Sequence, residues 1–311
     1  MTSRVLVTGG SGFIGTWVLR ELLNRGAVPI VVDLQPAHDR WNELLGDRAG
    51  EVVWSDASLL DRDSLLETIK AQGVKQVIHL AALLTPDCQK RPWDCCRVNV
   101  LGSTAVFDAA RLSGSVQAIS YASSYAVYGD ESAADESGWD SPTFYGAFKL
   151  AVDAIAAQYW KHFALPSVAI RPHVVYGPLR ERGLTAGPSL AVKAAVEGND
   201  FCISYQGAVA YDYVEDAARA LVRAAFETTR DATIVDLPGE RATTEEFADA
   251  IRVAVSESSA AISVDGPAIS SNVPASPNYI TNLFPDWTPT SLVDGVMRTA
   301  DYYRSLMNSN E

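Results

Sequence analysis

Three polar positions in the middle of the chain could together remove a proton from a hydroxyl group. Tyr145 and Lys149 lie four residues apart in a stretch of helical spacing, so both side chains are expected on one helical face. A tyrosine, with an ordinary pKa of about 10, is a poor base at neutral pH, but a neighbouring ammonium group favours the phenolate and lowers that pKa. Ser123 and Ser124 follow an apolar run over 116–121, and Ser124 could hold the oxygen of a substrate. Tyr145 is therefore the candidate base, and Lys149 the group that tunes it.

A glycine-rich turn at the start of the chain predicts a binding site for a dinucleotide. The apolar run 5–7 predicts a buried strand, Gly9, Gly12 and Gly15 follow at intervals of three, and an apolar pattern of helical period then begins. Gly9 permits the tight turn, Gly12 lets the backbone approach a pyrophosphate, and Gly15 lets the helix pack closely on the sheet. The helix N-terminus would then face the phosphates.

Acidic residues at the ends of the next strands refine this prediction. Asp33 ends the second predicted strand at the distance expected for a carboxylate that binds the adenosine ribose, and it would repel a 2′-phosphate, which favours NAD over NADP. Asp56 ends the third strand and could contact the adenine edge, although Asp61 and Asp63 could equally be acids at a helix start. Positive NAD⁺ beside Tyr145 would lower the pKa of its phenol further and would accept the hydride of an alcohol.

The elements that position these residues alternate between strands and helices, which predicts parallel βαβ units with right-handed crossovers. We expect an α/β fold, a Rossmann-type doubly wound parallel sheet with a smaller C-terminal substrate-binding lobe. The NAD-binding domain is expected over 1–178, with 209–237 returning to its sheet. The lobe is expected over 179–208 and 238–290, followed by a C-terminal helix over 291–311. An acidic loop that contains Trp139 and Pro142 is long enough to suggest a flap over the site.

Taken together, the motifs resemble those of extended short-chain dehydrogenases/reductases of the NAD-dependent epimerase/dehydratase family, over essentially the whole chain. The matching segments are Thr8–Gly15, Asp33, Asp56, His79–Ala82, Asn99, Ser123-Ser124, Val127–Gly129, Tyr145–Lys149, Arg171-Pro172, Tyr176–Pro178 and Asp212–Asp216. The resemblance places the catalytic Ser/Thr at Ser124, beside Tyr145 and Lys149, and it implies a homodimer built on the Asn99 helix and the Tyr145–Lys149 helix.

The resemblance also implies two sets of contact residues. The cofactor-binding positions are Gly9, Gly12, Phe13, Ile14, Asp33, Asp56, Ala57, Leu80, Ala81, Ala82, Asn99, Tyr145, Lys149, Pro172 and His173. The substrate positions are Ser123, Ser124, Leu84, Tyr145, His173 and Arg182. By contrast, His79 is expected to be a packed or hydrogen-bonded histidine of the core.

Departures from the family pattern narrow the expected chemistry. Sugar-nucleotide 4,6-dehydratases carry an Asp-Glu pair after the catalytic Thr, whereas this chain has Tyr125 and Ala126, so dehydration is not expected. Nucleotide-sugar enzymes place an arginine before the Asp-Tyr-Val stretch, where this chain has Tyr211, and a second arginine is missing around 270–276. Loss of a bidentate diphosphate contact is costly. Among the remaining cations, Arg180, Arg182 or Lys193 could substitute for it.

Composition excludes several other classes of function. A formal charge of −13 argues against nucleic acid and anionic membranes as partners. No apolar run is long enough to span a bilayer, and no signal segment precedes the first strand, so a cytoplasmic location is expected. Neither the four cysteines nor the four histidines have the spacing of a metal site, and the cysteines are expected to be reduced.

Two reactions and one non-catalytic function remain. The missing phosphate-binding arginines favour a dehydrogenase that oxidises a secondary alcohol on a sugar-like substrate such as a sugar or sugar acid. The family pattern favours the alternative, an epimerase of sugars or nucleotide sugars that takes its hydride back and recycles tightly bound NAD. A catalytically silent NAD sensor is a remote alternative, against which the retention of Ser124, Tyr145 and Lys149 speaks.

Overall fold

A seven-stranded parallel sheet forms the centre of the computed structural model, which describes residues 2–128, 143–227, 231–269 and 278–309. The strand order is β10-β6-β5-β4-β1-β2-β3, which confirms the predicted Rossmann-type α/β fold. The strands are β1 (Arg4–Thr8), β2 (Val28–Val32), β3 (Val53–Ser55), β4 (Gln76–His79), β5 (Ala118–Ala122), β6 (Ser167–Arg171) and β10 (Ala232–Asp236). The strand order reverses between β1 and β4, and ligands of such sheets bind outside the carboxyl ends of the strands at this point.

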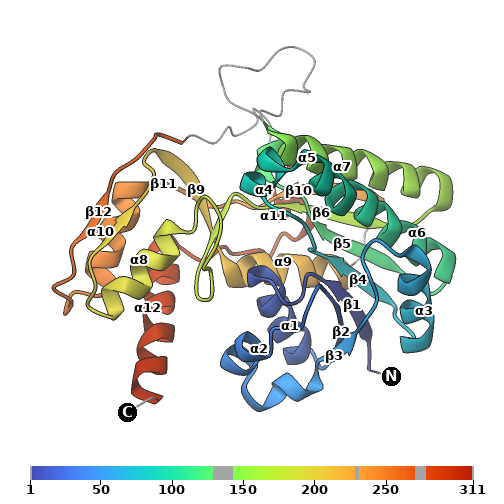
Figure 1. The fold of residues 1–311 in the computed structure, drawn as a ribbon, viewed down its shortest axis with the longest axis horizontal. Helices are drawn as coiled ribbons and strands as arrows, with labels where there is room; N and C mark the ends of the chain where they lie inside the picture. The colour runs from blue at the N-terminus through green and yellow to red at the C-terminus, as the bar shows by residue number, and fades with distance from the viewer. Residues whose placement is uncertain (1, 129–142, 228–230, 270–277, 310–311) are drawn as a thin grey trace.

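Helices cover both faces of the sheet (Figure 1). One face is covered by α3 (Arg62–Gln72), α6 (Ser103–Ser113) and α7 (Phe144–Phe163), and the other by α1 (Phe13–Asn24) and α9 (Val214–Phe226). Shorter elements connect them: α2 (His38–Leu45), η1 (Gly46–Glu51), α4 (Thr85–Lys90), α5 (Pro92–Cys95), η2 (Cys96–Gly102) and η3 (Tyr125–Val127).

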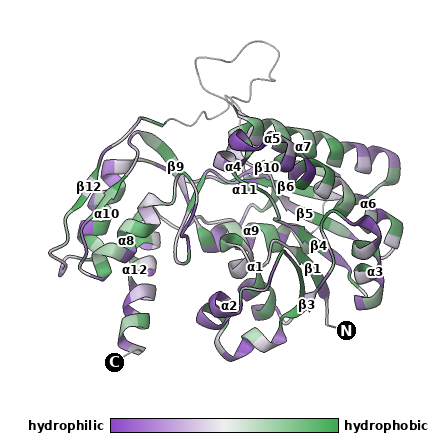
Figure 2. Cartoon of the chain, in the orientation of Figure 1, coloured by the Kyte–Doolittle hydropathy of each residue, from purple (hydrophilic) through white to green (hydrophobic). Residues whose placement is uncertain are grey.

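Alternation along β1 divides its side chains between two cores. Val5 and Val7 pack with residues of α1 and α9, whereas Leu6 packs with residues of α3 and α6, and all three are fully buried. Figure 2 shows apolar residues along the central strands and mixed polar and apolar residues along the covering helices. Burial on both faces is what holds the strand ends, and the residues on them, in fixed positions.

The smaller lobe lies at one end of the sheet and contains most of the remaining elements (Figure 1). These are β7 (Val174–Tyr176), α8 (Gly187–Val196), β8 (Phe201–Ile203), β9 (Ala208–Tyr213), β11 (Glu240–Thr243), α10 (Thr244–Ala254), β12 (Ile262–Val264) and α12 (Leu292–Ser309). The short helix α11 (Ile280–Leu283) lies instead beside β10 of the main sheet. The prediction that all of 209–237 returns to the main sheet was wrong for β9. This strand pairs with β7 and β11 in a separate sheet, and only α9 and β10 return to the main one. The predicted domain boundaries stay a prediction.

The predicted long helix around Asn99 is helical throughout but irregular. A π-helical turn, η2, interrupts it between α5 and α6, and Asn99 lies inside that turn. The acidic loop with Trp139 and Pro142 lies outside the described residues. In the described parts of the chain, no helix has the length and apolarity needed to cross a membrane.

Candidate functional site

The glycine turn between β1 and α1 is shaped to receive a dinucleotide. Gly9 has φ of +78°, and a Cβ there would lie 2.7 Å from the Ala81 amide nitrogen, just past the end of β4. A Cβ on Gly15 would lie 2.1 Å from the Gly9 carbonyl oxygen, so only glycine allows α1 to start this close to the turn. Phe13 and Ile14 form the first turn of α1, where no described side chain caps the amides. Such a cradle fits the pyrophosphate of NAD.

The acidic residues predicted to contact the adenosine end lie beside this turn. The Asp33 carboxylate accepts hydrogen bonds from the Ser11 amide (3.0 Å) and the Leu34 amide (2.8 Å), which hold it at the end of β2. Asp56 is exposed and accepts a hydrogen bond from Trp54 Nε1 (2.8 Å), while Ala57 next to it is buried. Trp41, which the sequence did not single out, donates from Nε1 to the Gly10 carbonyl (3.1 Å) and closes the turn from outside.

Behind the turn, His79 and Asn99 support the loop that follows β4. His79 is buried between the Thr8 hydroxyl (2.6 Å) and the Ser103 hydroxyl (2.8 Å), and burial lowers its pKa to about 3, so it is the core histidine that was predicted. The Asn99 side chain accepts from the Leu83 amide (2.8 Å) and donates to the Leu83 carbonyl (2.9 Å). This pair of bonds explains an asparagine inside a helix, and it fixes the backbone that follows Leu80, Ala81 and Ala82.

Ser124, Tyr145 and Lys149 come together at the carboxyl end of β5. Ser124 follows β5 and lies near enough to the Tyr145 side chain to lower its pKa. The helix α7 begins one residue before Tyr145 and is capped by Thr143, whose hydroxyl accepts from the Gly146 amide (3.1 Å). Lys149 Nζ lies 5.6 Å from the Tyr145 ring centroid and donates to the Ala122 carbonyl (2.6 Å). The helix and the strand end therefore place the candidate base, its neighbour and the oxygen holder at one edge.

Burial shifts the pKa values of both Tyr145 and Lys149. It raises the pKa of Tyr145 to about 12, and this effect outweighs those of Ser124 and of the charge of Arg180, both of which lower it. Lys149 is itself buried, which lowers its pKa to about 8 against the opposing effect of Asp153. Desolvation of the phenolate is therefore the largest effect of the protein on the Tyr145 pKa, and the lowering by Lys149 together with NAD⁺ stays a prediction.

Ser123 belongs to a buried chain of hydrogen-bonded polar side chains and not to the reacting edge. The prediction that Ser123 contacts the substrate did not anticipate this position. Its hydroxyl donates to the Asp153 carboxylate (2.9 Å), which also accepts from Arg171 Nη2 (2.6 Å). Arg171 Nη1 donates to the Tyr128 hydroxyl (2.7 Å), which in turn donates to Asp236 (2.8 Å). The chain joins the ends of β5, β6 and β10 and anchors the segment that carries Ser124.

Tyr125 and His173 lie next to this polar chain, in the segments that follow β5 and β6. Their rings pack against each other, and the Tyr125 hydroxyl and His173 Nδ1 are buried without a hydrogen-bond partner in the described structure. The Tyr125 amide donates to the Pro172 carbonyl (3.2 Å), and the His173 amide to the Asp212 carboxylate (2.7 Å). Burial lowers the pKa of His173 to about 3 and raises the pKa of Asp212 to about 7. His173 is thus a neutral hydrogen-bonding group at the position predicted for cofactor or substrate contact.

The remaining positions that the sequence analysis singled out differ in their exposure to solvent. Leu84 is exposed at the start of α4, and Arg182 is exposed in the loop after β7. Tyr211 is 2% exposed and packs on Phe247 and Tyr176, so its side chain is part of the lobe core. The four cysteines are free, and no group of potential metal ligands occurs within the described ranges.

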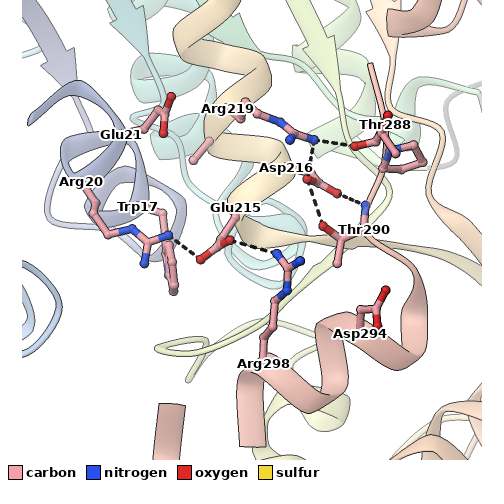
Figure 3. A pocket seen from close by; sticks show the side chains of 12 residues that line it. Trp17, Arg20, Glu21, Glu215, Asp216, Arg219, Thr288, Thr290, Asp294 and Arg298 are labelled. Carbon is pink, nitrogen blue, oxygen red and sulfur yellow. Dashed lines mark hydrogen bonds and ion pairs between the residues drawn. The ribbon is translucent and has the colours of Figure 1, made fainter. Parts of the chain in front are cut away.

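A second polar pocket, of about 480 Å³, lies away from this edge, between α1, α9 and the start of α12 (Figure 3). Glu215 pairs with Arg20 and with Arg298 (3.4 Å), and Asp216 accepts from Arg219 (2.8 Å) and from the Thr290 amide (2.6 Å). Its three guanidinium groups are therefore each paired with a carboxylate. We call this the paired pocket.

Comparison with known proteins agrees with this geometry. The sequence profile described as "NAD dependent epimerase/dehydratase family" matches residues 5–235. A UDP-N-acetyl-alpha-D-glucosaminuronate decarboxylase of Bacillus cytotoxicus is 29% identical over 77% of this chain and 76% of that protein, and a UDP-glucose 4-epimerase of Mycolicibacterium smegmatis is 29% identical over 71% and 72%. The crystal structure of Thermus thermophilus UDP-glucose 4-epimerase with NAD matches with a TM-score of 0.77 and 25% identity, over 97% of this chain and 99% of that one.

Proposed function

We propose that this chain, which belongs to the NAD-dependent epimerase/dehydratase family and is an NAD-dependent enzyme, is an epimerase of sugars or nucleotide sugars. The family resemblance predicted from the sequence motifs is confirmed. The observation that carries the proposal is the convergence of Ser124, Tyr145 and Lys149 on the strand edge next to the glycine turn.

The proposed chemistry begins with oxidation of a secondary alcohol. Tyr145 Oη removes the hydroxyl proton, Ser124 Oγ donates a hydrogen bond to the same substrate oxygen, and NAD⁺ supplies the hydride acceptor when bound. Lys149 would hold the nicotinamide ribose and add positive charge near the phenolate. In an epimerase the resulting ketone turns over in the site and is reduced on its other face, after which Tyr145 returns the proton.

The relatives favour this epimerase alternative over the simple dehydrogenase that the missing phosphate-binding arginines favoured. UDP-glucose 4-epimerases recur among the similar proteins. Dehydration stays unexpected, because Tyr125 occupies the place of the acidic pair and packs against His173. Substrates with a nucleotide diphosphate would need a contact other than Tyr211, whose side chain is in the core.

The test is to measure the cofactor content and then turnover. Purified protein is analysed by ultraviolet absorbance and native mass spectrometry, and UDP-glucose, UDP-glucuronate and free sugars are followed by NMR for isomerisation. Retained NAD with isomerisation and no net NADH supports the epimerase. Reversibly bound NAD⁺ with net NADH formation would instead establish the dehydrogenase, and binding of neither NAD nor NADP would overturn both.

We also propose a homodimer through α5, η2, α6 and α7, as the resemblance implied. Large apolar side chains on these elements are exposed: Trp93 (74%), Leu101 (55%), Phe144 (48%) and Phe163 (53%). Exposed apolar surface of this kind marks an interaction site. Sedimentation velocity of the wild type and of Leu101→Glu checks this, and a monomeric wild type would contradict it.

A further inference from the structure

Arg180 is a half-buried positive charge beside the catalytic tyrosine, and no described carboxylate neutralises it. Its Nε is fully buried without a hydrogen-bond partner, while its terminal nitrogens donate to the Val175 carbonyl and to the Thr185 hydroxyl (2.9 Å), both neutral. Burial lowers the pKa of Arg180 to about 10. The guanidinium group therefore remains a cation at neutral pH, with hydrogen-bonding capacity that the described protein leaves unused.

Arg171 shows what a fully satisfied guanidinium looks like in the same protein. Arg171 is buried, whereas Arg180 is half-buried, and Asp153 lies 2.6 Å from Arg171 Nη2 while Tyr128 accepts from its Nη1. A buried charge without such compensation is costly for stability. Arg180 is thus an exception that needs a reason.

The backbone is strained to hold Arg180 in place. Leu179 has φ of +72°, a conformation that is unfavourable for a residue with a branched side chain, and it is 4% exposed. Tyr303 of α12 holds this conformation, because its hydroxyl accepts from the Leu179 amide (3.2 Å). Strain of this kind persists where the surrounding structure enforces it, and it concentrates at ligand-binding sites.

The guanidinium lies between the cofactor turn and the catalytic base. Its Cζ is 5.8 Å from the Phe13 ring, and a Cβ on Gly183 would contact both Arg180 Nη2 (3.4 Å) and Leu84 Cδ1 (3.7 Å). Arg180 also interacts electrostatically with Tyr145. These contacts surround the place where the reacting carbon of a substrate must lie, within reach of both NAD and Tyr145 Oη.

We propose that Arg180 binds an anionic group of the substrate, a carboxylate or a phosphate, which is carried close to the reacting carbon. This inference rests on the proposed function and names its substrate class, an acidic sugar. A planar guanidinium matches such groups with two parallel hydrogen bonds. It also means that a neutral sugar leaves the half-buried cation without a counter-charge, which disfavours neutral substrates.

The test measures affinity and not turnover, so that it is independent of the reaction type. Dissociation constants for the NAD-loaded enzyme are determined by calorimetry for three pairs: glucuronate and glucose, glucose 6-phosphate and glucose, and UDP-glucuronate and UDP-glucose. We expect the acidic member of at least one pair to bind about 10- to 100-fold more tightly, as for a charged hydrogen-bonded contact. The pair that responds distinguishes carboxylate from phosphate.

Arg180→Gln is expected to abolish that preference, whereas Arg252→Gln, which removes an exposed charge on α10, is expected to keep it. If Arg180→Gln fails to fold, Arg180→Lys replaces it and should lose at least about fivefold of the preference, because lysine lacks the planar fork. No preference in the wild type, or an unchanged preference in the variants, overturns the proposal. So does a large loss of NAD affinity in Arg180→Gln, since Arg180 would then serve the dinucleotide. The two proposals can fail separately. If Tyr145→Phe abolishes turnover but the wild type binds acidic and neutral sugars equally well, the proposed function stands and this inference is wrong.

Discussion

The catalytic edge and the paired pocket are both rich in charge, but they differ in how that charge is satisfied. In the paired pocket Arg20, Arg219 and Arg298 each have a carboxylate partner (Figure 3). At the catalytic edge Arg180 has no described carboxylate partner, and Arg180, Tyr125 and His173 each retain a buried polar atom without a hydrogen bond. In the paired pocket the Arg219 Nε is also without a partner, but Asp216 neutralises the charge of that guanidinium. A pocket whose charges are already paired has few groups left to bind a ligand. Polar groups without partners, beside a strained turn, are free to bind one.

The sharpest test of this contrast is removal of the catalytic phenol. Tyr145→Phe deletes the proton acceptor and should lower kcat about 10²- to 10⁴-fold with NAD binding nearly unchanged. Glu215→Gln, made in the paired pocket, should leave kcat within about twofold, because that pocket is not part of the reaction. Equal losses in both variants would erase the distinction between the two regions.

A second test acts on the cofactor turn. In Gly15→Ala the new Cβ would overlap the Gly9 carbonyl, and because such overpacking costs about 1–3 kcal/mol, NAD affinity should fall about tenfold or more. Gly50→Ala is the matched control, since its Cβ meets no atom within 4 Å. NAD titration by calorimetry measures both. Wild-type affinity in Gly15→Ala would show that the turn does not hold the cofactor.

The pH dependence of stability should reveal a buried acid on the catalytic side. Because the folded-state pKa of Asp212 is raised to about 7, the native protein keeps a proton that the unfolded chain loses near pH 4. Its contribution to stability is therefore complete below about pH 4 and is lost as the pH rises through 7. Over that range the wild type should lose on the order of 1–4 kcal/mol more unfolding free energy than Asp212→Asn.

Urea unfolding at several pH values measures this difference. The exposed Asp47→Asn serves as the control and should follow the wild type. Parallel pH profiles for the wild type and Asp212→Asn would mean that Asp212 titrates as an ordinary carboxylate.

The smallest effect is expected inside the paired pocket itself. Glu215 and its two arginine partners are all partly exposed, and ion pairs of that kind contribute at most about 1 kcal/mol. Glu215→Gln should therefore lower the unfolding free energy by less than about 1 kcal/mol. A larger loss, measured by the same urea titration, would mean that the pocket is a structural centre of the protein.

Much of the fold and the main site could be predicted because their signals are local. The glycine spacing, the strand alternation and the Tyr145–Lys149 interval each depend on neighbouring residues, and the structure places them within a few residues of expectation. β9 was predicted in the wrong sheet because the residue pattern of a strand does not show which sheet the strand joins. Its partners β7 and β11 are distant in sequence.

Burial was the property that the sequence could not supply. The direction of the Tyr145 pKa shift depends on how much water the fold excludes, which residue spacing does not encode. Among the three cations that could replace the missing arginines, Arg182 and Arg180 differ only in their surroundings: Arg182 is exposed, whereas Arg180 is half-buried with a fully buried Nε. The Asp153–Arg171 pair left a faint signal, since Asp153 follows Lys149 by four residues on the same helix face.

The buried polar chain from Ser123 to Asp236 has a consequence for how the protein opens. Asp236 also exchanges backbone and side-chain bonds with Asn278, which leads into the lobe, at 2.8 and 3.2 Å. Breaking any one hydrogen bond of this chain would leave a buried charged group without its partner. The residues of the chain should therefore unfold together as one cooperative unit. The amides of Ser123 and Asp236, although far apart in sequence, should then share one rate of native-state hydrogen exchange. Ser124, the proposed holder of the substrate oxygen, would thereby be coupled to the opening of the segment that leads into the lobe.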